Sequence, residues 1–207
     1  MYLGQPPICH NVVVNNAEHN ELVDTIRDWA KALGFQDIGF TGIELNEHEA
    51  YLQKWLDAGY HGTMDWMDRH GTKRSRPSEL VPGTCTVISC RMDYQPEAKD
   101  AWQVLDTSDK GFVSRYALGR DYHKIIRSRL AKLADRIRSE LGSGDFRAFV
   151  DSAPVLERAI AEQSGLGWIA KNTMLINESA GSYFFLGEIY TDIPLPRSEP
   201  KQEKHCG

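Results

Sequence analysis

The sequence predicts an α+β fold, an α/β sandwich in which a mixed β-sheet is covered by helices. Segments with apolar residues at helical spacing alternate along the chain with short apolar or β-branched segments that are typical of strands. Only a turn that contains Gly181 separates the last two strands, so we expect them to form a hairpin. No glycine-rich phosphate-binding motif follows a strand, so neither a Rossmann nor a P-loop nucleotide site is predicted.

Four helices are predicted from apolar spacing and boundary residues, over residues 16–34, 47–58, 121–141 and 155–163. The longest helix ends at Gly142, and Pro154 suits the first turn of the last one. The residues of the longest helix that are expected to face the core are Ile125, Ile126, Leu130, Leu133, Ile137 and Leu141.

Five strands are predicted, over residues 35–40, 84–90, 147–150, 168–177 and 183–192. Cys85 and Cys90 fall on opposite faces of one strand, so they cannot bind a metal ion together. The polar segment 95–110 is expected on the surface. Residues 59–69 hold two glycines, two methionines and a tryptophan, which predict a turn and one short helix. This segment either packs against the core or lines a ligand site.

Length and composition restrict the class of protein. The 207 residues suffice for one large domain or two small ones. With 41% hydrophobic residues and a net charge of −5, the chain has a globular rather than a disordered composition. No uncharged apolar run approaches the ~18 residues of a membrane span, no signal peptide is recognisable, and four cysteines are too few for a disulfide scaffold. We therefore expect a soluble, cytoplasmic monomer with no membrane partner.

Asp151 is the first candidate for chemistry, because it follows an apolar strand and precedes a turn of small residues. Its carboxylate can cap the following helix, which lowers the pKa of a carboxyl, or it can donate a proton near pH 7, which needs a raised pKa. From the residues alone the cap is the simpler interpretation. A proton donor needs an apolar lid or a large ligand that keeps the carboxyl dry.

Other polar residues have structural interpretations when each is taken alone. Glu157 and Arg158 are expected to form an ion pair on a helix surface. His123 is expected to make a structural hydrogen bond rather than to bind a ligand. Two basic groups, in residues 69–76 and 115–132, are either solvated or in contact with nucleic acid.

Four motifs are more informative together than any one residue. They are GYHGTMDWM at 59–67, SRYALGRDYH at 114–123, VDSAPVLER at 150–158 and GLGWIAKN at 165–172. In this order and spacing they resemble the N-terminal half of epoxyqueuosine reductases. The resemblance extends from about Glu21 to Gly207.

This resemblance implies an oxidoreductase that depends on cobalamin and reduces the epoxide of epoxyqueuosine at the tRNA wobble position, which gives queuosine. It implies a nitroreductase-like cobalamin-binding domain, as in reductive dehalogenases. In the family, 4Fe-4S clusters supply electrons to the cobalt. The partner would be tRNA that carries epoxyqueuosine, and the electron donor stays unknown.

The same resemblance implies a domain organisation. Residues 1–195 would form the cobalamin-binding catalytic domain, and residues 196–207 a linker and the start of a ferredoxin-like 4Fe-4S domain. Cys206 matches the first metal ligand of that domain, and the further cysteines of the run do not follow it. The chain therefore resembles a truncated form in which no cluster assembles and which is inactive alone.

The resemblance also implies site residues. Asp151 matches the family's proton donor, which the corrin would cover, and this reverses the preference for a cap. Cobalamin contacts are matched by Arg74, Ser114, Asp151, Asn172, Leu175 and Leu186.

Two other functions stay open. The chain could be a cobalamin-binding carrier without turnover, or a flavin-binding oxidoreductase, since the corrin-binding domain is related in shape to flavin-dependent nitroreductases. Binding of cobalamin would exclude the flavin alternative, and turnover of epoxyqueuosine tRNA would separate a reductase from a carrier.

Overall fold

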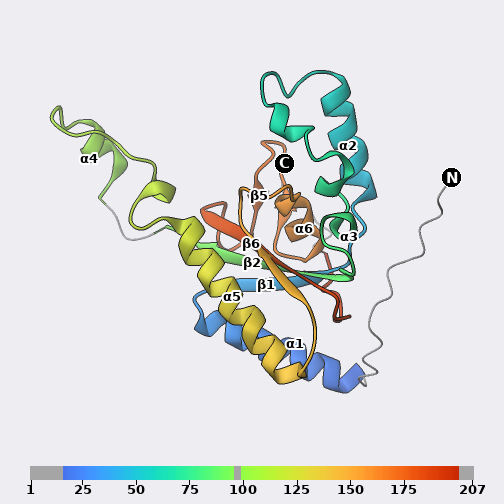
Figure 1. Cartoon of the computed structure of the whole chain (residues 1–207). Helices are drawn as coiled ribbons and strands as arrows, with labels where there is room; N and C mark the ends of the chain where they lie inside the picture. Colours follow the sequence, from blue (N-terminus) through green and yellow to red (C-terminus); the bar gives the residue numbers. More distant parts are fainter. Residues whose placement is uncertain (1–15, 96–98, 201–207) are drawn as a thin grey trace.

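A four-stranded sheet forms the centre of the computed structural model, which describes residues 16–95 and 99–200 and, of residues 16–19, only the backbone (Figure 1). The strand order is β1-β2-β6-β3. The strands are β1 (Asp37–Thr41), β2 (Thr86–Asp93), β6 (Phe184–Thr191) and β3 (Phe146–Phe149). The α+β class is confirmed. The sheet is antiparallel rather than mixed, because each of its three neighbouring pairs runs in opposite directions.

Helices α1, α2 and α5 agree with the predicted segments. The α-helices are α1 (Asn16–Ala32), α2 (Asn46–Asp57), α3 (Pro77–Leu80), α4 (Ala101–Leu105), α5 (Tyr122–Leu141) and α6 (Glu157–Gln163). Short 3-10 helices are η1 (Asp65–Met67), η2 (Gly71–Arg74) and η3 (Arg115–Ala117). The last α-helix begins later than predicted, because the Val155 N–H donates to the Ala153 carbonyl in a tight turn before it.

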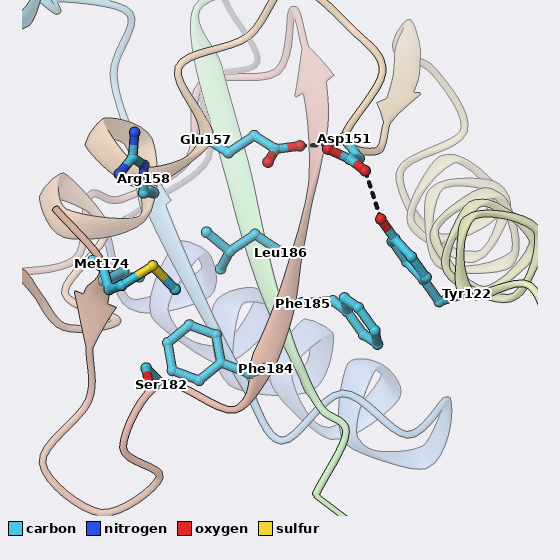
Figure 2. A pocket seen from close by; sticks show the side chains of 10 residues that line it. Tyr122, Asp151, Glu157, Arg158, Met174, Ser182, Phe184, Phe185 and Leu186 are labelled. Atoms are coloured by element: carbon cyan, nitrogen blue, oxygen red, sulfur yellow. Dashed lines mark hydrogen bonds between the residues drawn. The ribbon is translucent and has the colours of Figure 1, made fainter. Parts of the chain in front are cut away.

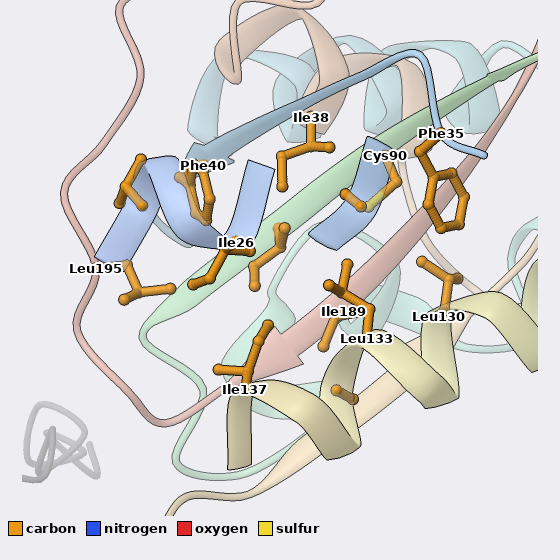
Figure 3. Close-up of a cluster of buried hydrophobic side chains, with 14 of the residues drawn as sticks. Ile26, Phe35, Ile38, Phe40, Cys90, Leu130, Leu133, Ile137, Ile189 and Leu195 are labelled. Atoms are coloured by element: carbon orange, nitrogen blue, oxygen red, sulfur yellow. The ribbon is translucent and has the colours of Figure 1, made fainter. Parts of the chain in front are cut away.

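Helices α1 and α5 cover one face of the sheet (Figure 1). Ile126, Leu130, Leu133 and Ile137 of α5 are fully buried there, as predicted. They pack with apolar residues of α1, β1, β2 and β6, such as Ile26, Phe40, Cys90 and Ile189 (Figure 3). Ile125 and Leu141 are only partly buried, because they lie at the margins of the apolar stripe.

The opposite face of the sheet carries α6 and a second, two-stranded sheet. This small sheet pairs β4 (Trp168–Ile169) with β5 (Leu175–Ile176). The predicted hairpin between segments 168–177 and 183–192 is therefore wrong. The first segment reverses within itself, since Ala170 N–H donates to the Met174 carbonyl and Thr173 has φ 66°. Strand β6 is instead free to pair with β2 and β3 at the centre of the main sheet.

The predicted surface excursion at 95–110 is exposed where the structure describes it and extends to residue 121, and α4 projects away from the rest of the molecule (Figure 1). Several large apolar side chains are exposed on it: Trp102, Leu105, Phe112, Val113, Tyr116 and Leu118. Within the described ranges, no helix is both long and apolar enough to cross a membrane.

Gly39 offers a test of how closely α6 packs against the sheet. A Cβ atom at Gly39 on β1 would overlap the Ser164 carbonyl, and it would lie 2.8 Å from the Ser164 Cβ. Because backbone must move, we expect Gly39→Ala to lower the free energy of unfolding by about 1–3 kcal/mol in urea denaturation. Gly111 is the matched control, since nothing lies within 4 Å of a Cβ there. Equal stability of the Gly39→Ala and Gly111→Ala variants would contradict this packing.

Candidate functional site

Asp151 lies in a strained turn that directly follows β3. Its φ is 47°, a left-handed conformation that a non-glycine residue adopts at a cost of about 1–3 kcal/mol. Its backbone N–H donates to Glu157 Oε1 at 2.6 Å, and the next N–H, of Ser152, donates to the Val150 carbonyl at 2.6 Å. The first residue of α6, Glu157, therefore fixes the backbone of the turn by a hydrogen bond.

The Asp151 side chain meets the first residues of α5. Its Oδ2 accepts a hydrogen bond from the Tyr122 hydroxyl at 2.6 Å and lies 3.0 Å from His123 Nε2. The other ring nitrogen of His123 lies 3.0 Å from Asp121 Oδ1. Burial and the hydrogen bond to Asp151 both raise the pKa of Tyr122, so this hydroxyl stays a donor. His123 makes the expected hydrogen bonds, and one of them reaches the candidate acid.

The capping interpretation of Asp151 is wrong. Helix α6 begins at Glu157, its N-cap residue is Leu156, and no side chain caps it. The Asp151 carboxylate instead points toward Tyr122 (Figure 2). Its side chain is 54% exposed, so the chain's own residues do not provide the dry surroundings that the sequence analysis required of a proton donor.

A cavity of about 170 Å³, here called the Asp151 pocket, opens beside this carboxylate. Its lining residues are Tyr122, Asp151, Glu157, Arg158, Met174, Leu175, Ser182, Phe184, Phe185 and Leu186 (Figure 2). Phe184 and Leu186 are two positions apart on β6, so they share one face of the sheet and form an apolar floor. The pocket thus combines an apolar floor with a polar rim.

A larger cavity of about 760 Å³ lies between α2 and α6 and shares Glu157 and Arg158 with the Asp151 pocket. Arg74 lines it, is 9% exposed, and donates to the carbonyls of Met67 (3.3 Å) and Trp66 (3.0 Å). Burial lowers the pKa of Arg74. Since Met67 also lines this cavity and Trp66 is exposed, residues 59–69 fit a ligand wall better than core packing.

Two carboxyls lie behind the Asp151 turn, the half-buried Glu157 and the fully buried Glu188, and neither was predicted from the sequence as part of the site. Burial and the nearby Asp151 carboxylate together raise the pKa of Glu157 to about 7, against the opposing effect of the hydrogen bond from the Asp151 N–H. Glu188 on β6 is fully buried, and neither of its oxygens has a hydrogen-bond partner among the described residues. Burial raises the pKa of Glu188 well above the ordinary value of a glutamate, because a carboxylate removed from water and left without hydrogen bonds is costly.

The predicted surface ion pair of Glu157 with Arg158 is wrong. Glu157 faces inward to the Asp151 turn, and the Arg158 guanidinium donates to the Thr173 carbonyl. A signal for such an inward acid was present at Glu188, which stands within the apolar run of β6. Glu157 carried no such signal, because the start of a helix is an ordinary place for an exposed glutamate.

The residues predicted to bind cobalamin are only partly brought together. Asp151, Leu175 and Leu186 line the Asp151 pocket, and Arg74 lines the larger cavity. Asn172 lies in the β4–β5 turn, where its Oδ1 accepts from the Met174 N–H. Ser114 is exposed ahead of η3 and lines neither cavity. Cys206 lies outside the described residues. Within the ranges 16–95 and 99–200, no three potential metal ligands gather.

Comparison with known proteins identifies the domain. Residues 74–152 match the family model described as epoxyqueuosine reductase QueG, DUF1730. Over most of its length the chain is similar to epoxyqueuosine reductases. The chain is 63% identical over 186 residues to an epoxyqueuosine reductase of Pseudomonas aeruginosa. The aligned region covers 90% of this chain and 52% of that protein. The chain spans about half the length of the curated relatives that it matches.

Solved structures of the epoxyqueuosine reductase family share the fold. One was determined with an epoxyqueuosine-modified tRNA-Tyr stem loop (26% identity, TM-score 0.76, covering 90% of this chain and 49% of that one). Another, from Bacillus subtilis, has a catalytic loop that is named for an aspartate and is swung out of the active site (26% identity, TM-score 0.76, 91% and 50%). A catabolic reductive dehalogenase is similar in fold alone (13% identity, TM-score 0.55, 98% and 24%).

Proposed function

We propose that this chain is the cobalamin-binding part of an epoxyqueuosine reductase, in which Asp151 donates a proton to the oxygen of the opened epoxide. The observation that carries the proposal is the position of Asp151, at the rim of an apolar pocket and in contact with Tyr122 and His123. The tRNA stem loop in one related structure supports a tRNA substrate. The swung-out aspartate loop in another supports a catalytic aspartate on a movable turn.

The residues that line the Asp151 pocket and the larger cavity fit the chemistry of cobalamin. A corrin is a broad, largely apolar ring with polar amides at its edge, so it needs an apolar wall and a few well-placed polar groups. Leu175, Phe184 and Leu186 supply the wall. The buried Arg74 guanidinium supplies N–H groups to the adjoining cavity of about 760 Å³, where amide or phosphate oxygens could accept them.

The residues around Asp151 prepare it for proton transfer. When bound, reduced cobalamin supplies the electrons that break the epoxide carbon–oxygen bond. The released oxygen takes one proton from the Asp151 carboxyl and a second from solvent, and it leaves as water when the other carbon–oxygen bond breaks, which balances the two-electron reduction to the alkene. A ligand that covers this carboxyl favours its protonated form, because a carboxylate removed from water is costly. Tyr122 and His123 hold the carboxyl in place, and the Glu157 hydrogen bond holds its backbone.

Turnover tests the proposal directly. The protein that contains this chain, loaded with cobalamin and supplied with a chemical reductant, should convert epoxyqueuosine in tRNA to queuosine, as measured by mass spectrometry of the digested RNA. Cobalamin binding without conversion would favour the carrier alternative. A preference for flavin over cobalamin would contradict the proposal. The cytoplasmic location and the monomeric state stay predictions.

Arg74→Met should weaken cobalamin binding about 10- to 100-fold, because hydrogen bonds from a charged donor contribute about 1.5–3 kcal/mol. Binding is followed by titration of the visible spectrum of cob(II)alamin. Arg69→Met is the matched control, since Arg69 is exposed and lines neither the Asp151 pocket nor the larger cavity. Thermal unfolding of both variants separates lost affinity from lost structure. Equal affinity of the two folded variants would show that Arg74 makes no cobalamin contact.

A further inference from the structure

A third pocket, with a volume of about 330 Å³, borders Tyr122 and Phe185. We call it the arginine–tyrosine pocket, after the residues that matter for its chemistry: Tyr94, Arg115, Tyr116, Arg120, Tyr122 and Phe185. Tyr122 and Phe185 line the Asp151 pocket as well. The two pockets are therefore neighbours that share one aromatic wall.

The shared wall is a stack of rings. Phe185 lies against Tyr122 with ring centroids 4.0 Å apart and planes 7° apart, and against Tyr94 with centroids 4.4 Å apart. Tyr116 contacts Tyr122 edge to face with centroids 6.3 Å apart, and half of its side-chain surface is exposed. Exposed, pre-ordered rings of this kind are platforms on which nucleobases stack, at about 1–3 kcal/mol per base.

The pocket also offers unpaired positive charge. Neither Arg115 nor Arg120 forms an ion pair with any residue of the described ranges, whereas Arg76 pairs with both Glu49 and Glu79. The acid in the pocket wall, Asp93, is already paired with Arg91 at 3.1 Å. Guanidinium groups bind phosphate oxygens in a planar, two-pronged geometry. An aromatic platform beside two free guanidinium groups has the chemistry of a nucleotide site.

We propose that the arginine–tyrosine pocket holds a nucleotide of the RNA strand next to the one whose base is reduced at Asp151. This inference rests on the proposed function. The shared wall of Tyr122 and Phe185 sets the order, because an RNA strand whose modified base reaches Asp151 brings its neighbouring nucleotide to the adjoining pocket. Tyr116 or Tyr94 stacks on the neighbouring base, and Arg115 and Arg120 bind the phosphates beside it.

Cobalamin also carries a nucleotide, so its tail has the same chemistry of an aromatic base and a phosphate. The RNA strand is the occupant favoured by the structure. Residues 99–121, which carry Arg115, Tyr116 and Arg120, project from the molecule with Trp102 and Phe112 exposed, as expected of a surface that meets a large partner (Figure 1). The larger cavity beside Arg74 is the better place for the tail.

The experiment measures RNA binding against salt. A fluorescent anticodon stem-loop RNA that carries epoxyqueuosine is titrated with the cobalamin-loaded protein at several KCl concentrations. Arg115→Gln and Arg120→Gln should each weaken binding about tenfold. Each should also reduce the slope of log K against log salt by about 0.7, the value for one phosphate contact on a single strand. Tyr116→Ala should weaken binding about 5- to 100-fold with an unchanged slope, because stacking releases no counterions.

Lys132→Gln is the control, since Lys132 is exposed on α5 about 15 Å further along the helix than Tyr122. It should bind RNA as the wild type does. If the two arginine variants keep the wild-type slope and affinity while the wild type still forms queuosine, the inference is wrong and the proposed function stands. If these variants lose cobalamin affinity but not RNA affinity, the pocket holds the cobalamin tail and the inference is overturned. Failure of the wild type to form queuosine would contradict the proposed function instead.

Discussion

Asp151→Asn should lower the rate of epoxide reduction by about 10²- to 10⁴-fold, the usual contribution of a general acid. Asparagine has the same shape and can still accept a hydrogen bond from the Tyr122 hydroxyl, but it has no acidic proton to donate. Affinities for cobalamin and for the RNA stem loop should therefore stay within about twofold of wild type. Single-turnover formation of queuosine, with the cofactor reduced in advance, measures the chemical step separately from electron delivery.

Tyr122→Phe is the matched variant for this experiment. It keeps the ring that stacks on Phe185 at 4.0 Å and removes only the hydroxyl that donates to Asp151. We expect a loss of about 2- to 10-fold, since a hydrogen bond to a neutral carboxyl contributes about 0.5–1.5 kcal/mol and the acid itself remains. Turnover by Asp151→Asn at the wild-type rate would remove Asp151 from the mechanism and leave the Asp151 pocket as a binding site only.

The second large effect concerns stability against pH. The ordinary pKa of a glutamate is 4.5, and that of Glu157 in the folded protein is about 7. Between these values the unfolded chain has released the proton and the folded protein has kept it. The unfolded chain thus binds fewer protons, and the free energy of unfolding falls as pH rises through this window. At about 1.4 kcal/mol per pH unit, the contribution of Glu157 amounts to roughly 3 kcal/mol.

Glu157→Gln isolates this contribution. Glutamine keeps an oxygen that accepts the Asp151 N–H and cannot ionise, so the turn is retained and the pH dependence is lost. The charged and titratable groups that influence Glu157 are Asp151, Arg158, His123, Glu188 and Tyr190. The difference between the two urea-derived stability curves therefore reports the titration of Glu157 together with its interactions with these groups. Curves that run parallel from about pH 4.5 to 7 would show that its carboxyl is not buried as described.

The secondary structure was largely predictable where one local signal dominates. Helix α5 has an apolar stripe, a terminal glycine with φ 68°, and a buried face that matches the predicted one. Strand β2 is β-branched and apolar, and the structure buries it as expected. The hairpin of β4 and β5 could not be predicted in this way. The chain reverses at Thr173, which adopts a left-handed conformation. Threonine is not a residue that predicts such a turn, as glycine would be.

In the candidate site, too, some features of Asp151 were predictable from the local sequence, and others depend on tertiary packing. Its place after an apolar strand marked it as a candidate, and the motif at 150–158 suggested a role for it. The side chains that contact its carboxylate are those of His123 and Tyr122, which lie 28 and 29 positions away in the sequence. Only the packing of α5 against the end of β3 brings them to the carboxylate. Burial of Glu157 likewise depends on the turn before α6 and on β6 behind it.

What the sequence by itself determined is the α+β class, the main helices, the resemblance to a family and the candidate acid, because periodicity and ordered motifs are properties of the chain in one dimension. The tertiary structure alone decided the antiparallel strand order, the inward direction of Glu157 and Glu188, and the aromatic wall shared by two pockets. The physical reason is that burial and charge pairing depend on distances between residues far apart in sequence. Such distances exist only once the sheet and its covering helices have packed together.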